Sequence, residues 1–195
     1  METDFSRRTE PLEPQRANLS PRVRRAVIFL QQVSYWFARH WLALANSANL
    51  LALAGAAAIP VMMAYGLSGL ADPLFASYHL VCHQQPERSF FILGHQMAFC
   101  QRDTAIYGAM ALAGLAVGAF RDRISPMSWL WFLLALVPIG VDGLTQLVGM
   151  RESSWQLRLI TGAIFGAAVV WTAYPRIDQF AAEILEVERR RERKR

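Results

Sequence analysis

Cysteine is scarce in this sequence, with two residues in 195, and this scarcity excludes a fold held together by a framework of disulfides. The first 25 residues lack the apolar core of a signal peptide, so we expect no cleavable signal there. A glycine-rich phosphate-binding loop and an evident nucleophile–base pair are also missing, so no familiar enzyme class is indicated. A chain of this length is expected to form one compact unit.

Charge is almost missing from the long apolar runs, although charged residues make up 18% of the chain. A water-soluble helical protein keeps a polar face on every helix, whereas several of these runs have none over a length that crosses about 30 Å of hydrocarbon. The net charge is +5, but basic and aromatic residues do not interleave as they do in a nucleic-acid-binding surface. We therefore expect membrane lipids around the chain and no nucleic-acid partner.

Four apolar runs predict an all-α integral membrane protein with a four-transmembrane-helix bundle. The spans are expected at about 47–70, 104–120, 127–149 and 155–174, inside a transmembrane domain over 47–175.

The two ends of the chain are polar. Residues 1–46 are expected to form a cytoplasmic tail, disordered over 1–21, followed by an interfacial amphipathic helix in which arginine and tryptophan suit the headgroup layer. Residues 22–45 could instead begin the first span or form a fifth one. Residues 176–195 are expected to form a basic cytoplasmic helix.

Basic residues give the expected orientation. The N-terminal segment, the turn at Arg121 and Arg123, and the C-terminal tail carry many of them, whereas the loop 71–103 and the turn 150–154 carry few. We therefore expect a multi-pass protein of the cell inner membrane with both termini in the cytoplasm. The structured loop 71–103 would then face outward.

Small residues recur four positions apart in two of the spans. Gly114 and Gly118 form one such face, and Gly162 and Gly166 form another. Faces of this kind allow helices to approach closely, so they are candidate seams for a membrane-protein partner or a homo-oligomer.

The sharpest chemical signal lies in the outer loop. His79, Cys82 and His83 stand at positions i, i+3 and i+4, and Cys100 and Asp103 repeat the three-residue step. Because one helical turn brings such pairs to one ion, we predict Zn or Fe held by Cys82, His83, Cys100 and Asp103. Two alternatives stay open, namely a Cys82–Cys100 disulfide in an oxidising compartment and two unpaired packing cysteines.

A carboxylate stands inside the third predicted span. Asp142 would lie roughly 10 Å deep, where a lone charge costs on the order of 3 kcal/mol, so it needs a partner. Arg158 is the first candidate partner and Arg102 the second. Asp142 and Arg158 are also candidate catalytic groups, with a purely structural ion pair as the alternative. Other residues expected at the same outward face are His79, Arg88, His95, Arg102, Gln146, Arg151 and Glu152.

Three stretches carry a family resemblance: CHQQPERSF at 82–90, CQRDTAIYG at 100–108 and DGLTQLVGMRESSWQLRLITG at 142–162. With them the chain resembles the prokaryotic predicted-membrane-protein family called domain of unknown function 2085, over roughly residues 78–166. That family often has a second cysteine where this chain has Asp103, and aspartate is also a metal ligand. The resemblance implies the membrane architecture and the place of the site, but no particular activity.

Two functions compete, and the sequence leaves open whether the chain is an enzyme. The first is a metal-dependent enzyme or redox protein that acts on a lipid-like substrate at the outer leaflet. The second is a non-enzymatic scaffold or accessory subunit of a membrane complex, with a Cys82–Cys100 disulfide. A transporter ranks third, because no repeat relates the pairs of spans and no charge lies at midplane depth.

Overall fold

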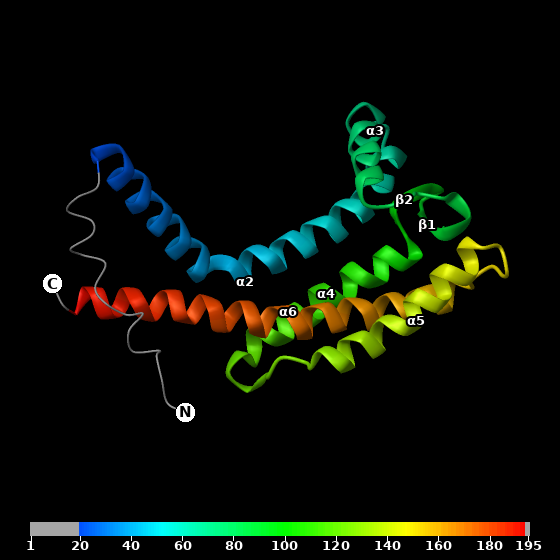
Figure 1. Ribbon diagram of the computed structural model, residues 1–195. Helices are drawn as coiled ribbons and strands as arrows, with labels where there is room; N and C mark the ends of the chain where they lie inside the picture. Colours follow the sequence, from blue (N-terminus) through cyan, green and yellow to red (C-terminus); the bar gives the residue numbers. More distant parts are fainter. Residues whose placement is uncertain (1–19, 194–195) are drawn as a thin grey trace.

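The computed structural model describes residues 20–193, apart from the side chain of Asp122. The chain is mostly helical, with the β-strands confined to one end of the helices (Figure 1). Its elements are α2 (Pro21–Ala64), α3 (Ser68–Ser77), β1 (Ser89–Ile92), β2 (His95–Cys100), α4 (Gln101–Ala119), α5 (Trp129–Leu147) and α6 (Trp155–Glu192). Short 3₁₀ turns cover Tyr78–Leu80, Pro86–Arg88 and Arg121–Arg123. The predicted disordered tail lies outside the described residues up to position 19, and so do the last two residues of the predicted C-terminal helix.

Three helices of the described chain, α2, α5 and α6, are long and apolar enough to cross a membrane. A helical protein with several membrane-length segments is therefore confirmed. α4 falls outside this set because its first turn carries Gln101, Arg102 and Asp103 and the rest is rich in alanine and glycine. It nevertheless lies in the middle of the molecule, in contact with both α2 and α6.

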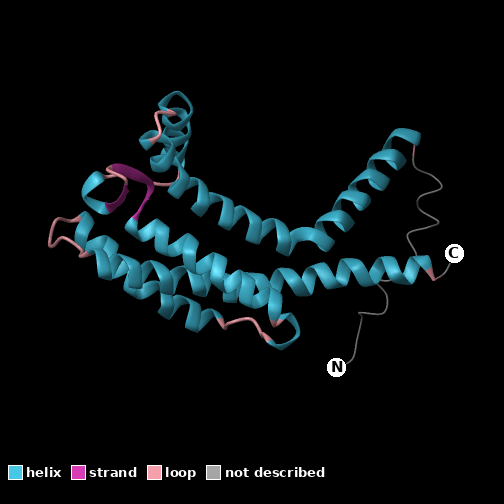
Figure 2. Cartoon of the chain, turned by 180° about the vertical axis from the view of Figure 1, so that it is seen from behind, coloured by secondary structure: helices cyan, strands magenta, loops and turns pink. Residues whose placement is uncertain are grey.

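The two longest helices differ from the expected boundaries. α2 has 44 residues, about twice the length of a membrane span, and it joins the expected interfacial helix and first span into one bent helix (Figure 2). No glycine or proline interrupts the sequence between Pro21 and Gly55, so nothing stops the helix there. α2 ends at Ala64 instead of residue 70, and Gly66 follows with φ 77°. α6 has 38 residues and continues through Pro175, which is buried inside it.

α4 and α6 make the most extensive contact between helices. A Cβ added at Gly162 would stand 2.6 Å from the backbone oxygen of Arg102, and Gly166 lies equally tightly against α4. Gly114 and Gly118 face α2. The predicted close helix contact is therefore confirmed, but it occurs within the chain. A partner would have to bind another surface, and its existence stays a prediction.

The outer loop was predicted to be structured but without strands, and it contains a β-hairpin. β1 and β2 pair antiparallel, and Leu93 and Gly94 form the turn with φ 51° and 81°. Two residues with positive φ are typical of the tight turn that matches the twist of a hairpin. β2 is anchored by Phe99, which is 1% exposed and contacts the rings of Tyr78 and Tyr107. β1 takes up most of the apolar run from Phe90 to Leu93.

Candidate functional site

One end of the molecule gathers most of the candidate residues. The β-hairpin, the first turn of α4, the last turns of α5 and the first turns of α6 meet there, at the end away from the C-terminus (Figure 1). We call this region the mouth and define it as residues 78–103 together with 142–158.

Two glutamines hold the loop before the hairpin in place. Gln84 is buried with φ 50°, and its Nε2 donates to the carbonyl oxygens of Phe75 at 2.8 Å and Ala98 at 3.1 Å. Nε2 of Gln96 donates to the carbonyl oxygen of Gln84 at 2.7 Å. These bonds fix Cys82 beside the start of α4. Sequence reasoning missed both glutamines, because their role depends on the hairpin.

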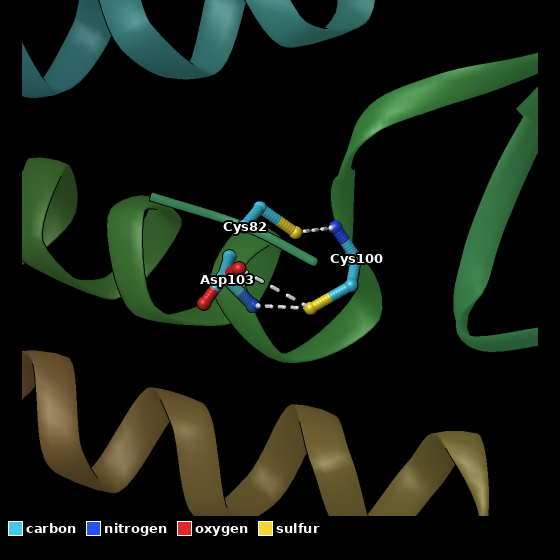
Figure 3. Close-up of side chains that lie close together, drawn as sticks. All are labelled: Cys82, Cys100 and Asp103. Atoms are coloured by element: carbon cyan, nitrogen blue, oxygen red, sulfur yellow. Dashed lines mark hydrogen bonds between the residues drawn. The ribbon is translucent and has the colours of Figure 1, made fainter. Parts of the chain in front are cut away.

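Cys82, Cys100 and Asp103 converge at the junction of β2 and α4 (Figure 3). Cys82 is 3% exposed, and its Sγ accepts a hydrogen bond from the backbone N–H of Cys100 at 3.2 Å. Cys100 caps α4: its Sγ accepts from the Asp103 N–H at 3.5 Å and lies 3.3 Å from Asp103 Oδ2. Both cysteines are free. The three ligand atoms all lie within 4.8 Å of one another.

The two thiols differ in acidity. A hydrogen bond to the Cys100 sulfur, together with burial, raises the pKa of the Cys82 thiol far above its usual range. The same hydrogen bond lowers the pKa of the Cys100 thiol. Cys100 is therefore the thiol that ionises first, and its thiolate accepts from Cys82. In its thiol form Cys100 instead donates to Asp103.

The three groups fit a small transition-metal ion. Tetrahedral zinc with sulfur and oxygen ligands needs ligand atoms about 3.5 to 3.8 Å apart, so a separation within 4.8 Å requires a contraction of about 1.3 Å at most. Among the described residues, one group of three or more histidine, cysteine and acidic side chains has its ligand atoms close enough together to share an ion, and it is this one. Two thiolates and a carboxylate leave a fourth position open.

His83 does not join the three groups, although the sequence placed it among the ligands. It is exposed, and so is His79. The expected helical spacing fails because a 3₁₀ turn ends at Leu80 and the chain continues as an irregular loop. His95 is half-buried at the start of β2 and also lies outside the group.

Asp142 is the centre of a second polar cluster. Its side chain is 1% exposed and forms ion pairs with Arg102 and with Arg151, the latter at 2.8 Å. The hydroxyl of Ser153 donates to Asp142 Oδ2 at 3.0 Å. The predicted second choice, Arg102, is therefore a partner, whereas Arg158 is not. Arg151 and Ser153 reach the carboxylate because the turn after α5 folds back over the helix end.

Arg158 has a different environment. It is 6% exposed, and its Nη1 donates to Gln101 Oε1 at 3.0 Å. Gln101 Nε2 donates in turn to the carbonyl oxygen of Ser89 at 3.4 Å, which links α6 to α4 and the hairpin. Within residues 20–193, the buried Nε atoms of Arg102 and Arg158 have no acceptor.

Three further predicted residues lie at the mouth without a place in either cluster. Arg88 is half-buried beside the hairpin, and Glu152 is exposed in the turn after α5. Gln146 is half-buried one turn beyond Asp142, and its Nε2 has no acceptor in the described part of the chain.

The interior of the bundle holds polar contacts that sequence reasoning missed. Asn46 Nδ2 donates to the carbonyl oxygen of Gly114 at 3.1 Å, and Asn49 Nδ2 donates to the hydroxyl of Tyr174 at 3.0 Å. Two asparagines three positions apart on one apolar helix are a signal of such contacts, since each needs a partner in the bundle.

Comparison with known proteins gives relatives but no activity. The family model described as predicted membrane protein, DUF2085, matches residues 82–172. An uncharacterized protein of Methanocaldococcus jannaschii is 46% identical over 106 residues, which cover 52% of this chain and 67% of that protein. An uncharacterized protein of Methanothermobacter thermautotrophicus is 37% identical over 95 residues, which cover 48% of this chain and 86% of that protein. No solved structure matches. The chain therefore belongs to the predicted-membrane-protein family DUF2085, as the motifs of the mouth indicated.

Proposed function

We propose that the chain binds zinc or iron at the mouth through Cys82, Cys100 and Asp103. The observation that carries this proposal is the convergence of two thiols and a carboxylate within 4.8 Å, on a loop and a helix cap that are both fixed by hydrogen bonds. Three protein ligands with an open fourth position are typical of catalytic rather than structural zinc.

The proposal includes four membrane crossings, by α2, α4, α5 and α6. α4 lies between α2 and α6, and these neighbours would shield its polar first turn from lipid. The mouth would face outward at the cell inner membrane, and both termini would face the cytoplasm. The basic N-terminal half of α2, in which Trp36 and Phe37 are exposed, would lie at the cytoplasmic interface. The transmembrane domain would then keep its predicted extent, residues 47–175.

The open position defines the chemistry that this site supports. Zinc held by these residues would supply a Lewis acid for the hydrolysis of esters, whereas iron would supply electron transfer. A substrate reaching the mouth from the outer leaflet would be lipid-like. In this arrangement Asp142 holds Arg102 and Arg151 in position, because its oxygens are already engaged by their guanidinium groups and by Ser153.

Elemental analysis of the full chain, purified in detergent, tests the metal site. Wild-type protein should contain close to one equivalent of zinc or iron, and Cys82→Ser should lose most of it, because a hydroxyl is a poor ligand for either ion. His83→Ala is the matched control and should keep the metal, since His83 is exposed and outside the group of ligands.

The opposite result would consist of metal-free wild-type protein with an oxidised Cys82–Cys100 pair. That outcome would contradict the metal proposal and favour a non-enzymatic scaffold or accessory subunit, whose fixed partner should then co-purify with the chain.

A further inference from the structure

Four arginines and four acidic residues lie at the mouth, but only one of the acids, Asp142, forms an ion pair with these arginines among the described residues. The guanidinium groups concerned belong to Arg88, Arg102, Arg151 and Arg158. Asp142 pairs with Arg102 and Arg151, and within the described residues Arg158 and Arg88 form no ion pair. The positive charges of Arg88 and Arg102 act on Arg158, and the carboxylate of Asp142 offsets them in part without contacting it. Two arginines of the mouth therefore lack a paired carboxylate among the described residues, and one of them, Arg158, is buried.

Burial makes the unpaired charge of Arg158 costly. Arg158 is 6% exposed, and Gln101, a neutral group, is the acceptor for its Nη1. Its Nε and the Nε of Arg102 are buried donors without acceptors among residues 20–193. A buried charge without a counter-charge and a buried donor without an acceptor both destabilise a fold. An anion with several oxygens would relieve both costs at once.

We propose that the arginines of the mouth bind the phosphate group of a membrane lipid. Guanidinium groups match phosphate oxygens with paired hydrogen bonds, and buried sites of this kind favour arginine over lysine. Arg158 stands one turn inside α6, at the level where a lipid headgroup would meet the bundle. Apolar side chains exposed around the ends of α5 and α6 offer a surface for acyl chains: Leu144, Leu147, Val148, Met150 and Trp155.

The phosphate site and the proposed metal site share the first turn of α4. Cys100 and Asp103 belong to the proposed metal site. Between them in the sequence, Gln101 accepts a hydrogen bond from Arg158, and Arg102 is itself one of the four arginines and pairs with Asp142. A phospholipid bound by the arginines would thus place its headgroup next to the open metal position. As substrate recognition this inference rests on the proposed function, but binding itself requires only the arginines.

Lipid binding to the full chain in detergent tests the inference, with EDTA present so that the result does not depend on a metal. Dioleoyl phosphatidic acid should bind and raise the unfolding temperature, whereas dioleoylglycerol, which has the same acyl chains without phosphate, should not. Arg158→Gln should weaken the affinity for phosphatidic acid about tenfold or more, as expected for the loss of a charge-assisted contact. Arg88→Gln provides a second variant if Arg158→Gln does not fold.

Arg123→Gln is the matched control, because it removes the same charge from an exposed position in the turn between α4 and α5. It should leave the affinity unchanged. Equal weakening by Arg123→Gln, or equal binding of dioleoylglycerol, would overturn the inference by showing unspecific attraction. If inorganic phosphate raises the unfolding temperature as much as phosphatidic acid does, the site binds an oxyanion, but the inference that a lipid supplies the phosphate group is overturned. A lipid-binding result in EDTA stands even if the metal proposal fails.

Discussion

Asp142 carries more polar contacts than any other carboxylate of the mouth, at a position with 1% exposure. Replacing it by asparagine removes the counter-charge of Arg102 and Arg151. We expect Asp142→Asn to lower the free energy of unfolding by about 3 kcal/mol, as for other buried pairs that lose one member. Thermal or denaturant unfolding of the purified protein measures the change.

Asp178→Asn is the control for this loss, because Asp178 pairs with Arg121 at the end of α4 away from the mouth, where both side chains are partly exposed. Asp178→Asn should lower the free energy of unfolding by about 1 kcal/mol or less. Equal destabilisation by the two substitutions would contradict the central role of Asp142.

Residue identities predicted the site better than residue spacing did. Three of the four predicted ligands converge because Cys82, Cys100 and Asp103 flank one hairpin. The fourth, His83, was chosen by helical spacing, and the loop there is not helical. Of the two predicted partners of Asp142, the second choice, Arg102, is correct; Arg151 was not predicted as a partner, because the fold of the turn after α5 brings it to the carboxylate.

At the scale of helices, glycine decides how closely α4 and α6 approach. A Cβ at residue 162 would stand 2.6 Å from the backbone oxygen of Arg102, and a backbone atom cannot move aside as a side chain can. We expect Gly162→Ala to destabilise the protein by about 1 to 3 kcal/mol through overpacking. Unfolding curves in detergent, compared with those of wild type, give the value.

Gly140→Ala is the matched substitution in α5, where an added Cβ meets nothing within 4 Å. It should be neutral or slightly stabilising, because alanine favours helix over glycine by about 1 kcal/mol. A larger loss of stability for Gly140→Ala than for Gly162→Ala would contradict the described contact between α4 and α6.

The helices themselves were largely predictable, and their ends were not. The apolar runs predicted α4, α5 and the membrane-length parts of α2 and α6. A helix that crosses the hydrocarbon core needs about 20 mostly apolar residues, and runs of that length are visible in the sequence. The continuation of α2 towards Pro21 agrees with the absence of glycine and proline from that stretch, whereas the continuation of α6 was not predicted because proline usually ends a helix and Pro175 lies inside it. The hairpin was missed because two strands this short have little pattern of their own.

At the scale of the whole molecule, every proposal depends on one arrangement. The hairpin, the first turns of α4 and α6 and the last turns of α5 gather at a common end (Figure 1). The long basic ends of α2 and α6 extend in the other direction. The proposed metal and phosphate sites need this mouth to face water on the side where lipid headgroups of the outer leaflet are available.

Labelling of single introduced cysteines in intact cells tests this arrangement most directly, in a chain whose native cysteines are replaced by serine. A membrane-impermeant maleimide should label Glu87→Cys and Glu152→Cys, both at exposed positions of the mouth. It should label Glu192→Cys, near the end of α6, only after the cells are permeabilised. Labelling of all three from outside, or of none, would place the mouth and the C-terminal end on one side of the membrane and contradict the account.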